Sequence, residues 1–421
     1  MTKRALRVQM NGVDVGRLER DSHGRARLSY DSSWRGAAQA MPLSLSLPLA
    51  ASRHEKYVEP YLWGLLPDNE AILEAWGKRF HTSARNAFGL LAYVGTDCPG
   101  AVQLLTEEAI ESPPDDSVIW LDEAEVADRL RRLRRDQSMW RDEDDAGQFS
   151  LGGAQAKTAF LFENGRWGIP SGRIPTTHIL KPGLRELDGH AENEHFCLSL
   201  MRELGLPVAR SSIEHFEDQT AIVVERYDRL RVGDRIVRVH QEDFCQATGT
   251  MPSAKYQNEG GPSARTIIEL LGAYSSKAEE DVASLIDALV IAWATVGTDG
   301  HAKNYSLLHA AGGKSRLAPF FDVASILPYA DATLRRTKLA MSIGGKYKVN
   351  EIGSAEWRKF ADDVKVPPEV VRGALQRIVP AIPDAAATVR RAAEREGLDR
   401  GVVRKLADAL GKRAGNLPHN F

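Results

Sequence analysis

The sequence changes from a strand-rich pattern to a helix-rich one, and this change constrains the fold more than any other feature. Short apolar runs typical of strands recur after residue 150, at KTAFLF, THILKP and AIVVERYD, with one clear helix at ENEHFCLSLMRELG. From residue 241 onward helical patterns dominate, including PPEVVRGALQRIV and DAAATVRRAAERE. We therefore predict a mixed α/β (α+β) fold in which a strand-rich lobe, 150–240, precedes a helical lobe, 241–421, with a cleft between them.

The first 110 residues have the pattern of a separate small α/β module. Leu6, Val8 and Met10 alternate with polar residues, and the Asn11-Gly12 pair that follows favours a primed turn. This pattern predicts a β-hairpin at the start of the chain. A helical stretch, NEAILEAWGKRF, and an apolar stretch, FGLLAYVG, come next.

Residues 111–149 are predicted to be a linker with a charged helix. ESPPDDS combines prolines with acidic and small polar residues, as linkers do, and DEAEVADRLRRLRRD has a helical pattern. Its arginines could contact phosphates, although a solvated helix face is the favoured interpretation. The acidic stretch RDEDDAGQ then leads into the strand-rich lobe.

Composition narrows the class of protein. The length of 421 residues suggests two or three cores, and a net charge of −2 argues against a dedicated nucleic-acid binder. The widely spaced Cys98, Cys197 and Cys245 form neither a disulfide framework nor a zinc cluster and fit a reducing compartment. Because no apolar run approaches membrane-spanning length and the N-terminus lacks a signal-peptide pattern, we expect a cytoplasmic protein with no membrane partner.

The stretch TVGTDGHAKNYSLL, residues 295–308, concentrates polar side chains where an apolar helix stops. Ser276 and Glu279 have the spacing of a capping box and predict the start of that helix, and Gly297 predicts its end. Asp299 to Asn304 is then a loop. YSLL and RLAPFF are predicted to be two strands of a hairpin, the second of which leads to Asp322.

This order of residues is typical of phosphoryl transfer. Asp299 and Asn304 have the D-x-x-x-x-N spacing of a protein-kinase catalytic loop, and Asp322 follows where a second, metal-binding carboxylate is needed. One carboxylate orients and deprotonates the attacking hydroxyl, while the amide and the other carboxylate bind Mg²⁺. The alternative is that Asp299 and Asn304 only cap a turn.

The strand-rich lobe supplies candidates for phosphate binding. SLGGAQAKT, 150–158, is not a Walker A loop, because Ala156 replaces the required glycine and a strand pattern follows it. A glycine loop followed by a strand is the kinase order, although a simple tight turn is the alternative. Lys181 lies on a short apolar strand, and Glu192 or Glu194 could orient it. The alternative for Lys181 is a solvated lysine at a strand end.

A third segment could contact the adenine base. VVERYDR ends a strand with Glu225, Arg226 and Tyr227. There the backbone could form hydrogen bonds with adenine, and Tyr227 could offer it a ring face.

Together these segments resemble the HipA family of toxin kinases. The shared segments, in the family's order, are SLGGAQAKT, THILKP, ENEHFCLSLMRELGLPV, VVERYDR, HQEDFCQATG, GTDGHAKNYS and APFFDVASILPY, and GLLPDNE and YVGTDCPGAVQL are similar to its N-terminal region. The resemblance covers nearly the whole chain. It implies a protein-kinase-like two-lobed fold with an extra N-terminal module, and serine/threonine kinase activity with ATP and Mg²⁺.

The resemblance also implies partners. Members of the family are the toxins of bacterial toxin–antitoxin pairs, with a helix-turn-helix antitoxin of the HipB type through which DNA is reached indirectly. Their known substrate is an aminoacyl-tRNA synthetase, most often glutamyl-tRNA synthetase. Its phosphorylation blocks tRNA charging, triggers a starvation response and arrests growth.

Residue roles follow from the matching motifs. Asp299 matches the catalytic base, Asn304 and Asp322 the nucleotide-contacting magnesium ligands, and Lys181 the lysine for the ATP phosphates. Ser150 matches a serine whose autophosphorylation expels the phosphate loop and switches the kinase off. Ala156 departs from members that carry an acidic residue there. The other residues assigned to ATP binding are Gly152, Gly153, Ala154, Gln155, Ala156, Lys157, Glu225, Arg226, Tyr227, His301 and Lys303.

Two alternative functions remain open at this point. The segment D-G-H-A-K-N also fits D-x-H-x-x-N of atypical lipid kinases, although no amphipathic basic helix accompanies it. Aminoglycoside-type phosphotransferases usually carry a histidine where Gly297 stands. The chain could also be a nonenzymatic co-repressor bound to a DNA-binding antitoxin, a role that is compatible with kinase activity.

Overall fold

The computed structural model describes residues 5–136, 149–184, 187–329, 334–398 and 401–420, so the acidic stretch 141–148 lies outside the described residues. The chain forms two compact units. Unit 1 comprises Met1–Pro182, Glu214–Ser253 and Ser306–Ser315, and unit 2 comprises Gly183–Ile213, Ala254–Tyr305 and Arg316–Phe421. No helix within the described ranges is long and apolar enough to cross a membrane.

Unit 1 begins with the predicted hairpin. Strands β1 (Ala5–Met10) and β2 (Val13–Arg20) pair antiparallel. The turn residues Asn11 and Gly12 have φ of 48° and 80°, as a primed turn requires. The strand order of this sheet is β4-β3-β2-β1-β5. The other elements of the module are β3 (Ala26–Tyr30), β4 (Arg53–His54), β5 (Val102–Leu105), α1 (Ser32–Arg35), α2 (Val58–Gly64), α3 (Glu70–Arg79), α4 (Ala87–Val94) and α5 (Glu107–Glu111).

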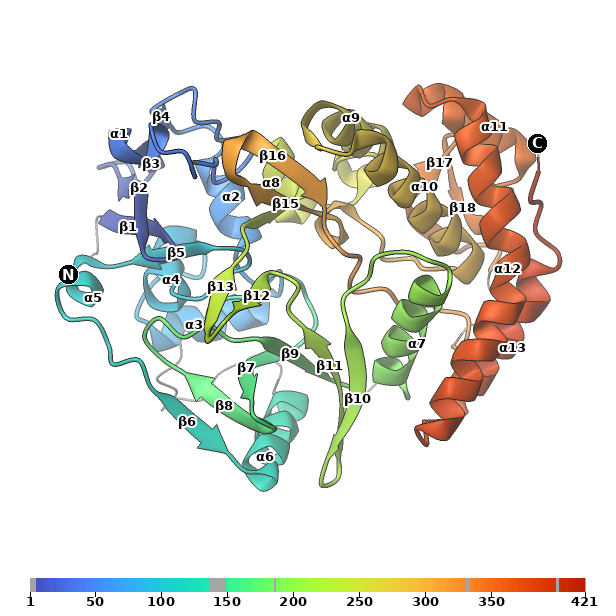
Figure 1. The fold of residues 1–421 in the computed structure, drawn as a ribbon, viewed down its shortest axis with the longest axis horizontal. Coiled ribbons are helices and arrows are strands. Elements are labelled where there is room, and N and C mark those ends of the chain that lie inside the picture. Colours follow the sequence, from blue (N-terminus) through green and yellow to red (C-terminus); the bar gives the residue numbers. More distant parts are fainter. Residues whose placement is uncertain (1–4, 137–148, 185–186, 330–333, 399–400, 421) are drawn as a thin grey trace. The chain divides into compact units, whose positions relative to one another are not determined.

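The second sheet of the chain has the strand order β10-β11-β9-β7-β8-β6 (Figure 1). The three strands predicted from the sequence are confirmed as β7, β9 and β11, which are adjacent in the sheet. The helix α6 (Glu123–Arg135) starts at a capping box formed by Asp122 and Glu125. The strands of this sheet are β6 (Val118–Leu121), β7 (Thr158–Glu163), β8 (Arg166–Pro170), β9 (His178–Pro182), β10 (Ser211–Phe216) and β11 (Gln219–Glu225).

The predicted strand RLAPFF is wrong in its length. Strand β16 covers only Lys314–Leu317, because Pro319 has no N–H to donate to a ladder. Phe320 instead bonds the segment Pro207–Ala209: its N–H donates to Pro207 O at 2.9 Å, and its carbonyl accepts from Ala209 N at 2.8 Å. Neighbouring elements are β12 (Arg229–Val232), β13 (Arg235–Arg238), β14 (Gln241–Asp243), α8 (Phe244–Thr248) and β15 (Ser306–Ala310).

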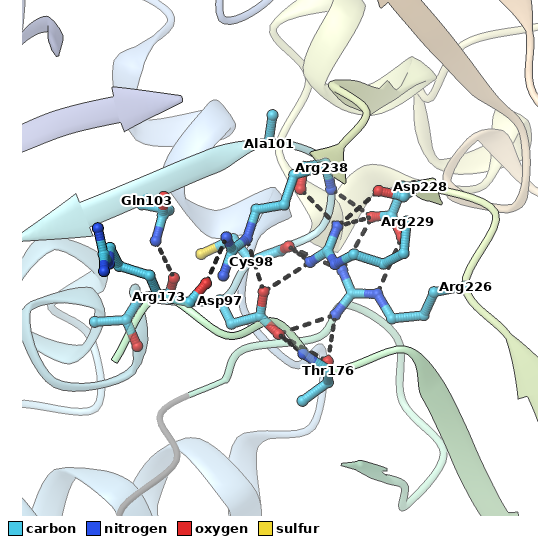
Figure 2. A network of polar contacts seen from close by, with 12 residues as sticks. Asp97, Cys98, Ala101, Gln103, Arg173, Thr176, Arg226, Asp228, Arg229 and Arg238 are labelled. Carbon is cyan, nitrogen blue, oxygen red and sulfur yellow. Dashed lines mark hydrogen bonds and ion pairs between the residues drawn. The ribbon is translucent and has the colours of Figure 1, made fainter. Parts of the chain in front are cut away.

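A buried ion network ties the N-terminal module to the chain that follows β11 (Figure 2). Asp97 Oδ1 lies 2.8 Å from Arg229 Nη2 and 3.2 Å from Arg238 Nε. Arg226 Nη2 lies 2.9 Å from Asp228 Oδ2, and its Nη1 lies 3.4 Å from Asp97 Oδ2. Burial raises the pKa of Asp97, but the three guanidinium groups outweigh burial and hold its pKa below the ordinary value.

In unit 2 the helix α10 (Ala278–Thr295) is buried over most of its surface. It contacts α9 (Ala264–Tyr274), α12 (Pro368–Arg395) and α13 (Val402–Ala414) (Figure 1). Trp293 and Trp357 meet edge to face, with ring centroids 5.6 Å apart. The remaining elements of this unit are α7 (His190–Glu203), β17 (Lys338–Ile343), β18 (Lys346–Lys348) and α11 (Ser354–Val364).

The two helical patterns predicted near the C-terminus are confirmed, and they form one helix of 28 residues, α12, with Pro380 and Pro383 inside it. The buried face of this helix continues on both sides of the prolines, so packing outweighs the lost backbone hydrogen bonds.

The predicted capping box at Ser276 is wrong. Helix α10 starts at Ala278, and its N-cap Lys277 makes no side-chain cap hydrogen bond.

We predict that Asp97→Ala destabilises the fold strongly. The change leaves three buried arginines without a shared carboxylate, and breaking such a buried ion network typically costs about 3–5 kcal/mol. Urea unfolding measures the loss. Asp116→Ala is the matched control: its partner Arg173 has an 85% exposed side chain, so the loss is expected to be much smaller.

The network also predicts how the stability of the fold changes with pH. Because the pKa of Asp97 is lowered in the folded state, its stabilising contribution is present above the ordinary Asp pKa and is lost as the pH falls. In the urea experiment, equal losses of stability in Asp97→Ala and Asp116→Ala would contradict a central role of the network.

Candidate active site

The C-terminal end of α10 positions the loop that carries Asp299. The cap residue is Val296, not Gly297 as predicted, and it adopts the left-handed conformation with φ of 55°. This conformation is costly for a β-branched residue, so the surrounding packing must enforce it. Arg413 of α13 donates to the carbonyls of Ala294 and Trp293 at 3.0 and 3.1 Å. Both carbonyls lie in the last turn of the helix, where carbonyls accept hydrogen bonds from groups outside the helix.

The loop itself holds Asn304 in a defined orientation. Its Nδ2 donates to the carbonyl of Asp299 at 2.7 Å, which leaves the amide oxygen Oδ1 as the atom available to a cation. The carboxylate of Asp299 is 62% exposed, whereas the side chain of His301 is 4% exposed. His301 Nε2 lies 3.7 Å from Asp299 Oδ1. Lys303 is buried within the short turn Ala302–Asn304.

Asp322 lies in a segment that is held at both ends. Upstream, Phe320 bonds the backbone of Pro207 and Ala209. Downstream, Ser325 Oγ donates to Thr295 O at 2.5 Å, and the backbone of Ser325 forms two hydrogen bonds with the side chain of Asn193 at 2.7 and 3.1 Å. Between these anchors Asp322 adopts φ of 58°, a conformation that non-glycine residues rarely take.

Asp299, Asn304 and Asp322 line one small cavity of about 30 Å³. That volume is enough to admit an ion or a water molecule, which needs roughly 10–15 Å³ by this measure. A carboxylate and an amide oxygen are hard oxygen donors of the kind Mg²⁺ prefers. The donor set of Asn304 and Asp322 therefore fits a magnesium ion that completes its shell with waters or phosphate oxygens.

The predicted phosphate loop lies in unit 1 between Ser150 and β7. Gly153 has φ of 98°, a backbone conformation that favours glycine. Lys157 Nζ donates to Gly152 O at 2.6 Å. Gln155 Nε2 donates to Pro182 O at 3.4 Å, which places the loop beside the end of β9.

Strand β9 carries Lys181 between β7 and β11. Lys181 is opposite Ile222 of β11, and His178 is opposite Glu225 at the end of the same strand. Lys181 on β9 therefore lies in the same sheet as β7, which follows the predicted phosphate loop, and β11, which leads to the predicted hinge segment. Glu192 and Glu194, the suggested partners of Lys181, lie on α7 in unit 2, and of these Glu194 is buried.

Arg226 has a different local environment from the one that a nucleotide-binding side chain needs. Its guanidinium belongs to the buried ion network (Figure 2), and its backbone N–H donates to Thr177 O at 2.9 Å. The Tyr227 hydroxyl donates to Gln241 Oε1. Burial raises the pKa of Tyr227.

Ser150 is fully buried in this conformation. Its hydroxyl donates to Leu65 O at 2.6 Å, and its N–H donates to Asp97 O at 3.0 Å. A kinase could reach this hydroxyl only after the segment moves away from the module.

The sequence interpretation missed residues that shape the loop. Tyr256 donates from its hydroxyl to Asp299 Oδ1 at 2.6 Å, although 43 residues separate them. Asn193 lies between the two glutamates that were singled out, yet it is the residue that holds the Asp322 segment. Neither contact belongs to a spacing motif, so a single sequence carries no signal for them.

Comparison with known proteins adds the family. Residues 6–105 match the HipA N-terminal domain, and residues 149–386 match the HipA-like C-terminal domain. The chain belongs to the HipA family. The protein Y4mE of Sinorhizobium fredii is 35% identical, with 98% of each chain covered.

Two further comparisons concern HipA proteins themselves. The serine/threonine-protein kinase toxin HipA of Shewanella oneidensis is 28% identical over 91% of this chain and 89% of its own. The fold matches a solved complex of HipA, HipB and operator DNA from the same organism, with a TM-score of 0.85, 25% identity, and coverage of 98% of this chain and 97% of that one. The predicted fold class and the resemblance to HipA are therefore confirmed.

We predict that Ser150→Glu displaces the phosphate loop. A carboxylate cannot remain in a buried site next to the Leu65 carbonyl without a large desolvation cost, so the segment should move into solvent. Hydrogen exchange of the peptide covering 149–157 should become faster. Ser150→Ala, which adds no charge, is the matched control and should keep slower exchange. Equal exchange in both variants would contradict this account.

Proposed function

We propose that this HipA-family chain is an ATP-dependent serine/threonine protein kinase that acts as the toxin of a toxin–antitoxin pair. The observation that carries the proposal is the convergence of Asp299, Asn304 and Asp322 on one cavity at the end of α10. A base, an amide oxygen and a second carboxylate are the protein groups that protein-kinase phosphoryl transfer needs.

Asp299 acts in this proposal as the base. Its exposed carboxylate accepts the proton of a seryl or threonyl hydroxyl as that oxygen forms a bond to the γ-phosphorus of ATP. The bond between the γ-phosphorus and the β–γ bridging oxygen breaks, and ADP leaves. The Asn304 hydrogen bond to the Asp299 carbonyl keeps the loop in the shape that presents this carboxylate.

The nucleotide phosphates and the metal need charged or polar groups of the protein. In unit 1, Lys157 and Lys181 provide cations for the phosphates, and the loop from Gly152 to Lys157 covers them. In unit 2, Asn304 Oδ1 and the Asp322 carboxylate, which line one cavity, would hold Mg²⁺. When bound, Mg²⁺ neutralises the negative charge that develops on the phosphate oxygens. Glu225, Arg226 and Tyr227 form the proposed hinge segment beside adenine, and the guanidinium of Arg226, which belongs to the buried ion network, takes no part in binding the base.

The biological setting comes from the family. A relative is named as a serine/threonine-protein kinase toxin, and the matching solved structure contains HipB and operator DNA. We therefore propose a HipB-type helix-turn-helix antitoxin as the partner, with DNA contacted through it, in the cytoplasm. The proposed substrate is an aminoacyl-tRNA synthetase, with glutamyl-tRNA synthetase as the first candidate. Its phosphorylation would arrest growth.

The burial of Ser150 supports a self-inactivating switch. A phosphate adds roughly −1.5 to −2 charges at neutral pH, which the buried site beside Leu65 O cannot accommodate. Autophosphorylation of Ser150 would hold the loop from Gly152 to Lys157 away from the nucleotide, and the activity would fall.

Asp299→Ala is expected to abolish phosphate transfer and toxicity without unfolding the chain. Loss of a positioned base is typically worth about two to four decades in rate. Incubation with γ-labelled ATP, Mg²⁺ and a cell lysate measures transfer, and mass spectrometry of the labelled band identifies the substrate. Asp384→Ala, an exposed change on α12 of the same unit, is the control and should retain full activity. Near-normal transfer by the Asp299 variant refutes its role as the base.

Asp322→Asn is expected to weaken magnesium-dependent nucleotide binding more than metal-free binding. The change removes one anionic metal ligand and keeps the size of the side chain. Calorimetry of a nonhydrolysable ATP analogue, with and without Mg²⁺, separates the two affinities. Asp384→Asn makes the same chemical change away from the cavity and should leave both affinities intact. The metal role fails if the Asp322 variant loses equal affinity in both titrations.

A further inference from the structure

Tyr256 contacts the proposed base from a different part of the chain. Its hydroxyl donates to Asp299 Oδ1 at 2.6 Å. Within the part of the chain that the structure describes, this carboxylate accepts the Tyr256 hydrogen bond and lies 3.7 Å from His301 Nε2, and both contacts involve Oδ1. The carboxylate is 62% exposed, so its second oxygen, Oδ2, is left for a substrate.

The ring of Tyr256 is held against the catalytic loop. It meets the ring of His301 edge to face, with centroids 5.0 Å apart and an interplanar angle of 84°. Next to it, Lys255 O accepts the N–H of Ala302 at 3.4 Å. His301 is itself buried, so Tyr256 rests on a fixed surface of the loop.

The backbone of Tyr256 is fixed as well. Its carbonyl accepts the N–H of Glu259 and of Gly261, each at 3.0 Å. The next residue, Gln257, exchanges two hydrogen bonds of 2.9 Å with Ser342 of β17. The hydroxyl of Tyr256 is therefore carried by a segment anchored on both sides of the residue.

We propose that Tyr256 is a positioning residue for the Asp299 carboxylate. An exposed aspartate samples several side-chain rotamers, and one strong hydrogen bond to Oδ1 selects the rotamer that directs Oδ2 toward the substrate hydroxyl. Phosphoryl transfer depends on such alignment, because a misplaced base loses rate even when the nucleotide is bound normally. This inference rests on the proposed kinase function.

If the same hydroxyl blocked the base, its removal would change the rate of phosphate transfer in the opposite direction. If Tyr256 occupied the place of the substrate hydroxyl, removing it would raise the rate. The hydrogen bond involves only one of the two carboxylate oxygens, and this observation favours positioning.

Tyr256→Phe tests the proposal, because it removes the hydroxyl and keeps the ring against His301. Tyr274→Phe is the matched control, since it makes the same change at an exposed position of α9 in the same unit. For the full-length chain, initial rates of phosphate transfer from γ-labelled ATP with Mg²⁺, to the chain itself and to lysate proteins, are measured over a range of ATP concentrations. Binding of a nonhydrolysable ATP analogue and thermal unfolding are measured in parallel.

For Tyr256→Phe we expect the maximal rate to fall roughly 10- to 100-fold, as for the loss of one hydrogen bond to a charged group. The ATP concentration at half-maximal rate, the analogue affinity and the unfolding temperature should match those of Tyr274→Phe. An unchanged or higher maximal rate overturns the proposal, and so does a loss of rate matched by loss of analogue affinity or stability.

The design separates this inference from the function on which it rests. A wild-type chain that transfers phosphate to neither acceptor refutes the kinase proposal and this one with it. A wild-type chain that is active, with Asp299→Ala inactive and Tyr256→Phe as active as wild type, refutes the role of Tyr256 alone.

Discussion

The anchoring of the C-terminal end of α10 is the constraint on which the rest of the candidate site depends. Arg413 bonds the carbonyls of Trp293 and Ala294, and Val296 takes a left-handed conformation that a valine adopts only when packing enforces it. Ser325 bonds Thr295 O from the Asp322 segment. One helix end therefore fixes both segments, and for this reason a carboxylate, an amide and a second carboxylate share one cavity.

In unit 1 a buried ion network takes the corresponding role. Asp97 binds guanidinium groups that follow β11, while its backbone carbonyl accepts the N–H of Ser150. The same residue therefore connects the N-terminal module, the segment that follows β11 and the segment that begins at Ser150. Hydrogen bonds to Asp97 O and Leu65 O of the module hold Ser150 in its buried position. The cost of burying these charges is offset only while the network is complete.

Local motifs could be predicted from the sequence, and contacts between distant segments could not. The hairpin at Asn11-Gly12, the strand carrying Lys181 and the loop from Asp299 to Asn304 follow from turn chemistry, apolar patterning and spacing. The end of α10 at Val296 could not be predicted in this way, because Gly297 is the better local candidate for a helix end. The surrounding packing places the cap at Val296 instead. The helical patterns of α12 could be predicted, but their union into one helix across Pro380 depends on the buried face that continues on both sides of it. Tyr256 reaches Asp299 across 43 residues, with no periodicity to reveal it.

We propose that the α10 loop and the Asp322 segment hold the metal and the phosphates of ATP. A crystal structure of the full chain with a nonhydrolysable ATP analogue and Mg²⁺ tests it most directly. We expect a magnesium ion bound to Asn304 Oδ1 and the Asp322 carboxylate, with the γ-phosphate facing Asp299. A nucleotide bound elsewhere, or a metal ion that contacts neither Asn304 nor Asp322, would refute this assignment.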